Sequence, residues 1–239
     1  MMPQNASQPL NARTFSPEQV AAEQAAFMRK VYAIMAFGLG ATGLTALIVA
    51  HSNLQKLILG TPGVFLGLLI AELVMVWTFA SLARRLSAVG AAALFYVYAM
   101  MNGLTLSIVF LVYTASSIES TFFVTAATFA AMSAYGYVTK RDLTGVGNFM
   151  FMGLIGLIIA SFVNFWMRSP MMYWLLTYVG IAVFVGLTAY DTQKIKELNV
   201  IGNSGTEEDH KEAIHGALIL YLDFINLFLY LLRLLGRRR

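Results

Sequence analysis

Long apolar stretches separated by short polar breaks run along most of the chain. A transmembrane helix needs about 20 predominantly apolar residues, and seven stretches reach that length. They lie at residues 31–51, 59–82, 88–112, 118–138, 146–166, 171–191 and 214–235. Membrane-spanning strands would instead alternate polar and apolar residues over segments of about 10 residues, and none of these stretches does. The pattern predicts an all-α membrane protein, a bundle of seven transmembrane helices.

The polar segments divide the chain into two parts. Residues 1–29 are rich in Gln, Ala, Ser and Pro, and they lack the basic start and short apolar core of a secretory signal peptide. They predict a flexible tail that ends in a short lead-in helix, because Ser16, Pro17 and Gln19 form a capping-box pattern. Residues 30–239 form the transmembrane domain, whose longest predicted loop runs from 192 to 213.

Composition supports a membrane protein. Hydrophobic residues make up 59% of the 239 residues and charged residues only 12%, with a mean hydropathy of +0.70. A soluble domain carries about 25% charged residues. The absence of cysteine excludes a disulfide framework. The basic residues behind the net charge of +4 lie at the ends of apolar stretches, so we expect a lipid bilayer and no nucleic acid as partner.

Basic residues in the breaks predict the orientation of the chain. With the N-terminus in the cytoplasm, ten Lys and Arg residues fall on the cytoplasmic side and two, Lys56 and Arg168, fall outside. Seven spans would then place Arg233 and residues 237–239 outside, against the rule. A last segment that re-enters the membrane, or a cytoplasmic C-terminus with the opposite sense, stays open.

Three carboxylates fall inside the predicted spans: Glu72, Asp191 and Asp223. An ionisable residue within a span is energetically costly and by default marks a functional site. Asp223 lies about 10 residues inside its span, roughly 15 Å from the edge at 1.5 Å per residue. Structural roles stay open for the other two. Asp191 is also interpretable as an interfacial acid paired with Lys194, and Glu72 as a protonated acid hydrogen-bonded to a neighbouring helix.

Other polar residues on the last span share a face with Asp223. At 100° per residue the set occupies about a quarter of the helix circumference. Its members are His215, Asp223, Asn226, Tyr230 and Arg233. Such a face is expected to point into the bundle. A second, weaker polar face on the third span carries Tyr98, Asn102 and Thr105.

A pair formed by Asp191 and Asp223 would act as a pH switch. Two neighbouring carboxylates in a low-dielectric interior cannot both be ionised cheaply, so the pair shares one proton. With the proton it is a hydrogen-bonded clip between two helices, and without it the pair repels itself unless a cation or an arginine arrives. Pairing requires the sixth span to continue to about Lys196, because Asp191 otherwise lies only a few residues from the membrane boundary.

Calcium is the expected cation, because it binds carboxylate and carbonyl oxygens. Asp191 and Asp223 are its predicted metal ligands, with Asn226 in support. These are too few ligands for tight capture, which suits a site that ions pass through. We therefore predict no tightly bound cofactor, and calcium as a transported or weakly bound ion.

Four sequence segments resemble the Bax inhibitor-1 family, also called the transmembrane Bax inhibitor motif family. They are TAYDTQKIK at residues 188–196, LYLDFINLFLYLLRLLG at 220–236, GLTLS at 103–107 and TKRDL at 139–143. The resemblance runs from about residue 30 to the end and is greatest to bacterial inner-membrane members. It implies a multi-pass protein of the bacterial inner membrane, with seven helices and the last helix surrounded by the other six.

The resemblance also implies a function and roles for individual residues. It implies a pH-sensitive calcium leak governed by two aspartates, which correspond to Asp191 and Asp223. An arginine at the end of the second span acts in the family as a latch on the first aspartate. Arg84 matches that arginine, with Arg85 as the fallback. Glu72 lies one position away from an ungapped match to the glutamate that the family carries in its second span.

Three functions compete. We favour the pH-sensitive calcium leak. The alternative is a non-conducting regulator that binds other membrane proteins through the tail 1–29 and the acidic loop 206–212, since some bacterial relatives resemble modulators of a membrane-bound AAA protease. An intramembrane aspartyl protease is disfavoured, because Leu-Tyr-Leu precedes Asp223 where that class has Gly-x-Gly. With no other catalytic motif, we expect that the protein is not an enzyme.

Overall fold

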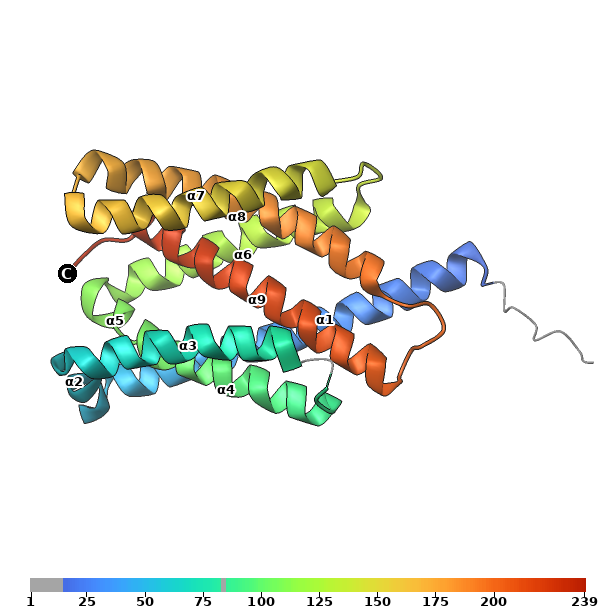
Figure 1. Cartoon of the computed structure of the whole chain (residues 1–239), viewed down its shortest axis with the longest axis horizontal. Coiled ribbons are helices and arrows are strands. Elements are labelled where there is room, and N and C mark those ends of the chain that lie inside the picture. Colours follow the sequence, from blue (N-terminus) through green and yellow to red (C-terminus); the bar gives the residue numbers. More distant parts are fainter. Residues whose placement is uncertain (1–14, 83–84) are drawn as a thin grey trace, which may run out of the picture.

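The computed structural model describes residues 15–82 and 85–239, and within them it contains nine helices and no β-strand (Figure 1). The helices are α1 (Pro17–Ala50), α2 (Asn53–Gly60), α3 (Pro62–Leu82), α4 (Ala88–Leu106), α5 (Val109–Val112), α6 (Ala115–Val138), α7 (Thr144–Met167), α8 (Pro170–Leu198) and α9 (Glu207–Leu235). The predicted all-α class is confirmed.

Six of the described helical stretches are long and apolar enough to cross a membrane. They are α1, the combined stretch of α4 and α5 (Ala88–Val112), α6, α7, α8 and α9. Helix α3 coincides with the predicted second span, but its apolar core within the described residues, Gly63–Phe79, is shorter than the others. The membrane helix bundle is confirmed, and a count of seven depends on α3.

The start of α1 follows the sequence prediction. Ser16 Oγ accepts a hydrogen bond from the Gln19 backbone N–H at 3.2 Å, and the Ser16 N–H donates to Gln19 Oε1 at 2.9 Å. The lead-in helix is the first part of α1, which continues unbroken to Ala50. Residues 1–14 of the predicted tail lie outside the described residues.

Two short helices were not predicted. Helix α2 begins after Ser52, whose side chain accepts a hydrogen bond from the Leu54 N–H at 3.3 Å. Helix α5 completes the third predicted span after a break at Ser107 and Ile108. The hydroxyl of Ser107 donates to the Leu104 carbonyl at 2.6 Å, so a side chain at the break hydrogen-bonds the last turn of α4.

The predicted loop at 192–213 is wrong, because α8 continues to Leu198 and α9 begins at Glu207. The connection is limited to residues 199–206, and residues 192–198 belong to α8, where Gln193 is buried. The Gln193 side chain accepts from the Leu143 N–H at 2.8 Å and donates to the Arg141 carbonyl at 2.9 Å. It thereby holds the connection between α6 and α7.

The acidic segment 206–212 is a helix start and not the predicted loop. Thr206 caps α9 by accepting a hydrogen bond from the Asp209 N–H at 3.2 Å. Acidic residues in the first turn suit the positive end of the helix macrodipole. Asp209 itself is only 2% exposed.

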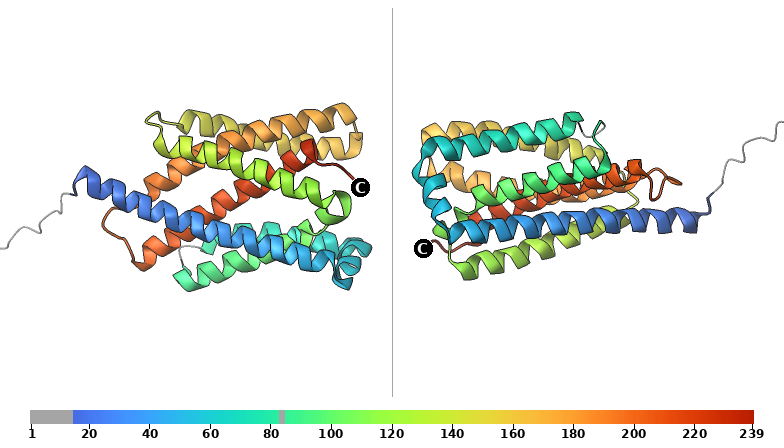
Figure 2. Two further views of the ribbon diagram at one scale, coloured as in Figure 1. Left: turned by 180° about the vertical axis from the view of Figure 1, so that it is seen from behind. Right: turned by 90° about the horizontal axis from the view of Figure 1, so that it is seen from below.

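Helix α9 is the most buried of the six long apolar stretches. In the 18-residue apolar segment of α9, 56% of the residues are buried, against 11% in the corresponding segment of α7. It packs against α1, α4, α6 and α8. Figure 1 and Figure 2 show it running between a group formed by α1, α3 and α4 and a group formed by α6, α7 and α8. Polar groups on α9 therefore face protein on several sides.

The C-terminal residues are held at the end of the bundle opposite to the start of α1 (Figure 1). The Thr114 N–H donates to the Arg237 carbonyl at 3.1 Å, and the Arg239 N–H donates to the Val112 carbonyl at 3.0 Å. An antiparallel bridge joins Tyr113 to Arg238. Because α9 is one continuous helix between the two ends of the bundle, it does not re-enter.

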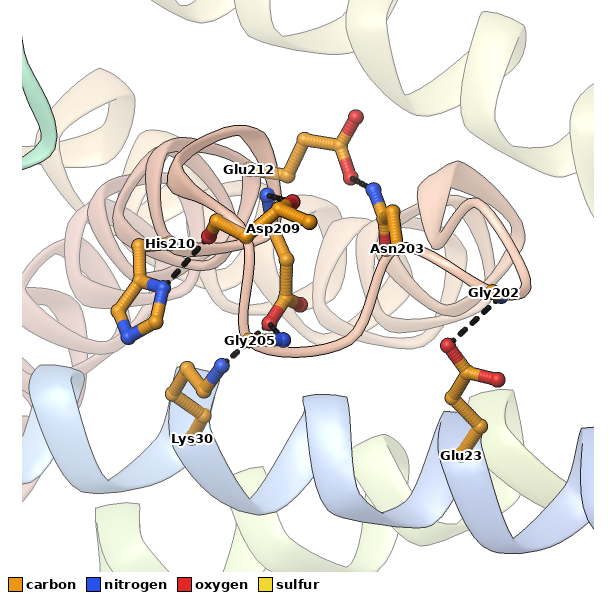
Figure 3. Close-up of polar contacts among 9 residues, drawn as sticks. Glu23, Lys30, Gly202, Asn203, Gly205, Asp209, His210 and Glu212 are labelled. Atoms are coloured by element: carbon orange, nitrogen blue, oxygen red, sulfur yellow. Dashed lines mark hydrogen bonds and ion pairs between the residues drawn. The ribbon is translucent and has the colours of Figure 1, made fainter.

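A cluster of polar contacts holds the α8–α9 connection against α1 (Figure 3). Lys30 Nζ lies 2.5 Å from Asp209 Oδ2, which also accepts a hydrogen bond from the Gly205 N–H at 2.8 Å. Towards the start of α1, Glu23 Oε1 accepts from the Gly202 N–H at 2.9 Å. These contacts fix the adjoining ends of α8 and α9.

Close packing of α6 on α8 depends on Gly136. A Cβ atom at this position would lie 2.1 Å from the Ala189 carbonyl oxygen. Small residues at helix contacts allow the backbones to approach where no hydrophobic force drives association in lipid. We expect Gly136→Ala to lower the free energy of unfolding by about 1–3 kcal/mol, the usual cost of overpacking. Thermal unfolding in detergent measures this loss. Gly156→Ala is the control, since a Cβ there meets nothing within 4 Å, and equal melting temperatures for the two variants would contradict the packing role.

The ion pair between Lys30 and Asp209 is predicted to stabilise the fold. Lys30→Met leaves a buried carboxylate without its cation, and we expect a loss of about 2 kcal/mol, as for other charged hydrogen bonds. Lys211→Met is the matched control, because Lys211 forms a longer, more exposed pair with Glu207 at 3.7 Å. Chemical denaturation in detergent compares the two variants. A loss no larger for Lys30→Met than for Lys211→Met would show that the ion pair does not anchor the connection.

Candidate functional site

The structure brings Asp191 of α8 and Asp223 of α9 together. Their side-chain carboxyl groups line the same cavity and lie close enough to interact with each other. Asp223 is 5% exposed and Asp191 is half-buried. The two acids that the sequence singled out in separate spans therefore form one site.

The extension of α8 to Leu198 makes this contact possible. Asp191 lies seven residues before the end of the helix, so it is carried inside the bundle and does not mark a membrane boundary. The predicted continuation to about Lys196 is therefore confirmed. Lys194 pairs with Glu197 at 2.9 Å, so the interpretation of Asp191 as the partner of Lys194 is not supported.

A cavity of about 770 Å³ adjoins the aspartate pair. Side chains from α3, α7, α8 and α9 line it, and most of them are apolar. The polar exceptions include Asn148 of α7 and Asn226 of α9. Within the described residues, Asp223 Oδ2 is buried and has no hydrogen-bond partner. An unsatisfied oxygen in a lined cavity is a group able to take a ligand or a proton.

The predicted polar face of α9 divides in the structure. Asp223, Asn226 and Tyr230 line the cavity. Near one end of the helix, the Arg233 guanidinium lies 5.0 Å from the centre of the Tyr173 ring. Near the other end, His215 stacks on Phe79 of α3 with ring centres 6.1 Å apart. Only the middle of the face thus belongs to the site.

Asn148 is a cavity residue that sequence reasoning missed. The Asn226 amide, which was predicted, donates to the Leu222 carbonyl at 2.8 Å and leaves its oxygen for other contacts. The available signal for Asn148 was its spacing from Gly147, Phe151 and Leu154, which also line the cavity. Such spacing places residues on one helix face.

Glu72 and Asn102 belong to a different polar cluster. Thr105 Oγ1 donates to Glu72 Oε1 at 2.8 Å, and Asn102 Nδ2 donates to the Tyr98 hydroxyl at 3.2 Å. The Tyr98 ring meets the Tyr221 ring edge-on, with centres 5.9 Å apart. Tyr221 precedes Asp223 by two residues, which places the two side chains about 200° apart on α9. Neither Glu72 nor Asn102 lies at the aspartate pair. The hydrogen bond from Thr105 of α4 to Glu72 of α3 agrees with the structural interpretation of Glu72 as an acid bonded to a neighbouring helix.

The predicted latch is only partly visible. Arg84 lies outside the described residues. Arg85 is exposed beyond the end of α3, and the ion pairs found within the described residues do not include it. Within the described residues, Arg85 therefore forms no ion pair with Asp191.

Comparison with known proteins identifies the family. The family model described as "Inhibitor of apoptosis-promoting Bax1" matches residues 24–239. The chain is 52% identical over 215 residues to the inner membrane protein YbhL of Escherichia coli (strain K12), covering 89% of this chain and 92% of that protein. It is 44% identical over 213 residues to the uncharacterized protein RP147 of Rickettsia prowazekii, covering 89% and 90% of the two chains.

A third relative, an uncharacterized protein of Borreliella burgdorferi, is 41% identical over 214 residues and is matched over 92% of its length. The family match and these identities cover nearly all of the described helices. The chain is accordingly a multi-pass protein of the bacterial inner membrane. It belongs to the Bax inhibitor-1 family.

Proposed function

We propose that the chain forms a pH-sensitive calcium leak that is gated by the Asp191–Asp223 pair. The contact between the two carboxyl groups beside a cavity carries this proposal. An ionised carboxylate only accepts hydrogen bonds, so a hydrogen bond between two carboxyl groups requires a proton on one of them. The resting state in this proposal holds that proton.

The shared proton joins α8 to α9. When it leaves, two negative charges face each other in an interior with a low dielectric constant. Two unit charges about 4 Å apart repel by about 4 kcal/mol at an effective dielectric constant of 20. An energy of this size shifts a two-state equilibrium by roughly three powers of ten. Deprotonation therefore favours a state in which the helices separate or a cation enters.

Calcium fits the oxygen ligands that face the cavity. The two carboxylates and the side-chain oxygen of Asn226 are hard ligands of the kind calcium prefers. Calcium usually takes about six to eight oxygens, so these groups would bind it weakly, with water completing its shell. Weak binding allows an ion to leave as well as to enter.

The proposal includes seven spans with α9 as the central helix. Counting α3 as the seventh span places the start of α1 and the end of α9 on opposite sides of the membrane. Most of the basic connections share the side of the α1 start, which is the cytoplasmic side by the positive-inside rule. The packing of α9 between the other helices supports a central position.

The proposed gate predicts a pH-dependent calcium flux. Liposomes that contain a calcium dye and the purified protein should show low flux at about pH 6 and higher flux at about pH 8, a range that brackets a shared proton. Asp191→Asn and Asp223→Asn replace a group that releases a proton by one that keeps its hydrogens. Each variant should give low flux that no longer changes with pH.

Asp142→Asn is the control for these variants. Asp142 lies between α6 and α7, and hydrogen bonds from the Thr144 side chain and backbone N–H lower the pKa of its carboxyl. It therefore stays ionised throughout the experiment, and its replacement should leave the pH profile unchanged. Wild-type protein without flux, or a profile that neither Asp191→Asn nor Asp223→Asn alters, would refute the calcium leak.

An arginine latch on Asp191 is the second part of the proposal. Arg84 is the proposed latch residue, with Arg85 as the fallback. If Arg84 holds the closed state, Arg84→Gln should raise calcium flux at about pH 6 by roughly tenfold, the effect of about 1.4 kcal/mol. Arg85→Gln serves as the neighbouring control. Unchanged flux in both variants would exclude a latch at this turn, and an increase only in Arg85→Gln would assign it to Arg85.

A further inference from the structure

A second cavity, of about 620 Å³, lies between α1 and α6, away from the aspartate pair. Both helices pack against α9, which contributes Phe224 to the floor of this groove. The left view in Figure 2 shows α9 between α1 and α6. The groove shares none of its lining residues with the cavity at Asp191 and Asp223, so it requires a separate explanation.

Small side chains keep the groove open to the membrane. The floor consists of large buried residues, among them Met28 and Phe129. The exposed edges carry alanines on both helices: Ala36 on α1 and Ala130 and Ala134 on α6. One hydrogen bond crosses between the walls and joins the Tyr32 and Ser133 hydroxyl groups at 2.5 Å. The result is a narrow apolar channel on a lipid-facing surface.

The length of the groove corresponds to one leaflet. Its walls run from residue 25 to 36 on α1 and from 126 to 138 on α6. At 1.5 Å per residue these segments are roughly 16–18 Å long, and half of the hydrocarbon core is about 15 Å. The groove thus matches one lipid chain, entering from the side on which α1 begins.

A cation lies in the outer half of the groove, about one helical turn from its outer end at Ala25. Arg29 lines it, is exposed, and takes part in none of the ion pairs found within the described residues. The neighbouring Lys30, in contrast, is neutralised by Asp209. Nearby, Lys196 Nζ donates to the carbonyl of Tyr137, another lining residue, at 2.7 Å. Guanidinium groups bind phosphate through paired N–H donors.

We propose that this groove binds an anionic phospholipid from the leaflet at the start of α1. One acyl chain lies along the alanine edges, and the phosphate contacts Arg29. A zwitterionic headgroup would place its own ammonium group next to the cations Arg29 and Lys196. Phosphatidylglycerol carries no ammonium group and avoids this repulsion. Attraction to one arginine at a membrane surface corresponds to about a fivefold preference.

Native mass spectrometry tests the proposal. The full-length protein is released from mixed micelles that contain equal amounts of phosphatidylglycerol and phosphatidylcholine, and the retained lipids are counted. We expect one retained phosphatidylglycerol, with about a fivefold preference over phosphatidylcholine. Arg29→Gln should reduce that preference to near parity. Arg168→Gln, at an exposed arginine after α7, should leave it unchanged.

A pair of tryptophan variants tests the apolar part of the site. Ala130→Trp fills the groove and should abolish retention, whereas Ala131→Trp, at an exposed neighbour on α6 outside the groove, should retain the lipid. Melting temperatures verify that both variants fold, and Arg29→Gln decides the question if Ala130→Trp does not fold. Equal retention of the two lipids, equal loss in both tryptophan variants, or a lipid-free dimer whose formation Ala130→Trp prevents would overturn the proposal. The last result would assign the groove to a second copy of the chain.

Discussion

Contact between two carboxyl groups inside a helical membrane protein is the constraint on which the rest of this structure depends. Asp223 is almost fully buried and Asp191 is half-buried. Each is tolerable only with a proton, a cation or a donor beside it. Because α8 and α9 carry one acid each, the group that neutralises the pair also determines how the two helices pack against each other. The protonation state of two side chains thus affects the arrangement of the bundle.

The surroundings restrict the ways in which this contact can change. On one side, the Lys30–Asp209 ion pair and the capped start of α9 hold the α8–α9 connection to α1. At the far end, backbone hydrogen bonds attach residues 237 and 239 to the start of α6 and the end of α5. Between these anchors lies the aspartate pair beside its cavity. Movement concentrated in the middle of the bundle would change the cavity without releasing either end.

The sequence predicted the class of fold and the identity of the paired acids, because both follow from strong physical signals. Long apolar runs have few possible structures in a membrane, and Asp223 lies too deep to be a surface residue. The loop at 192–213 was wrong because polarity alone does not show that Gln193 is buried and hydrogen-bonded across to the α6–α7 connection. Likewise, one polar face on α9 did not reveal that His215 and Arg233 contact aromatic rings beyond the cavity. Both differences between prediction and structure arise from tertiary contacts, which the sequence pattern does not show.

Counting protonated carboxyl groups tests the central claim most directly. Infrared difference spectroscopy of the protein in lipid, recorded between about pH 6 and pH 8, detects a carboxyl group that loses its proton across the range expected for a shared proton. The account predicts one such signal in the wild-type protein and none in Asp191→Asn or Asp223→Asn. A wild-type spectrum without this change, or a signal of the same size in both variants, would contradict it.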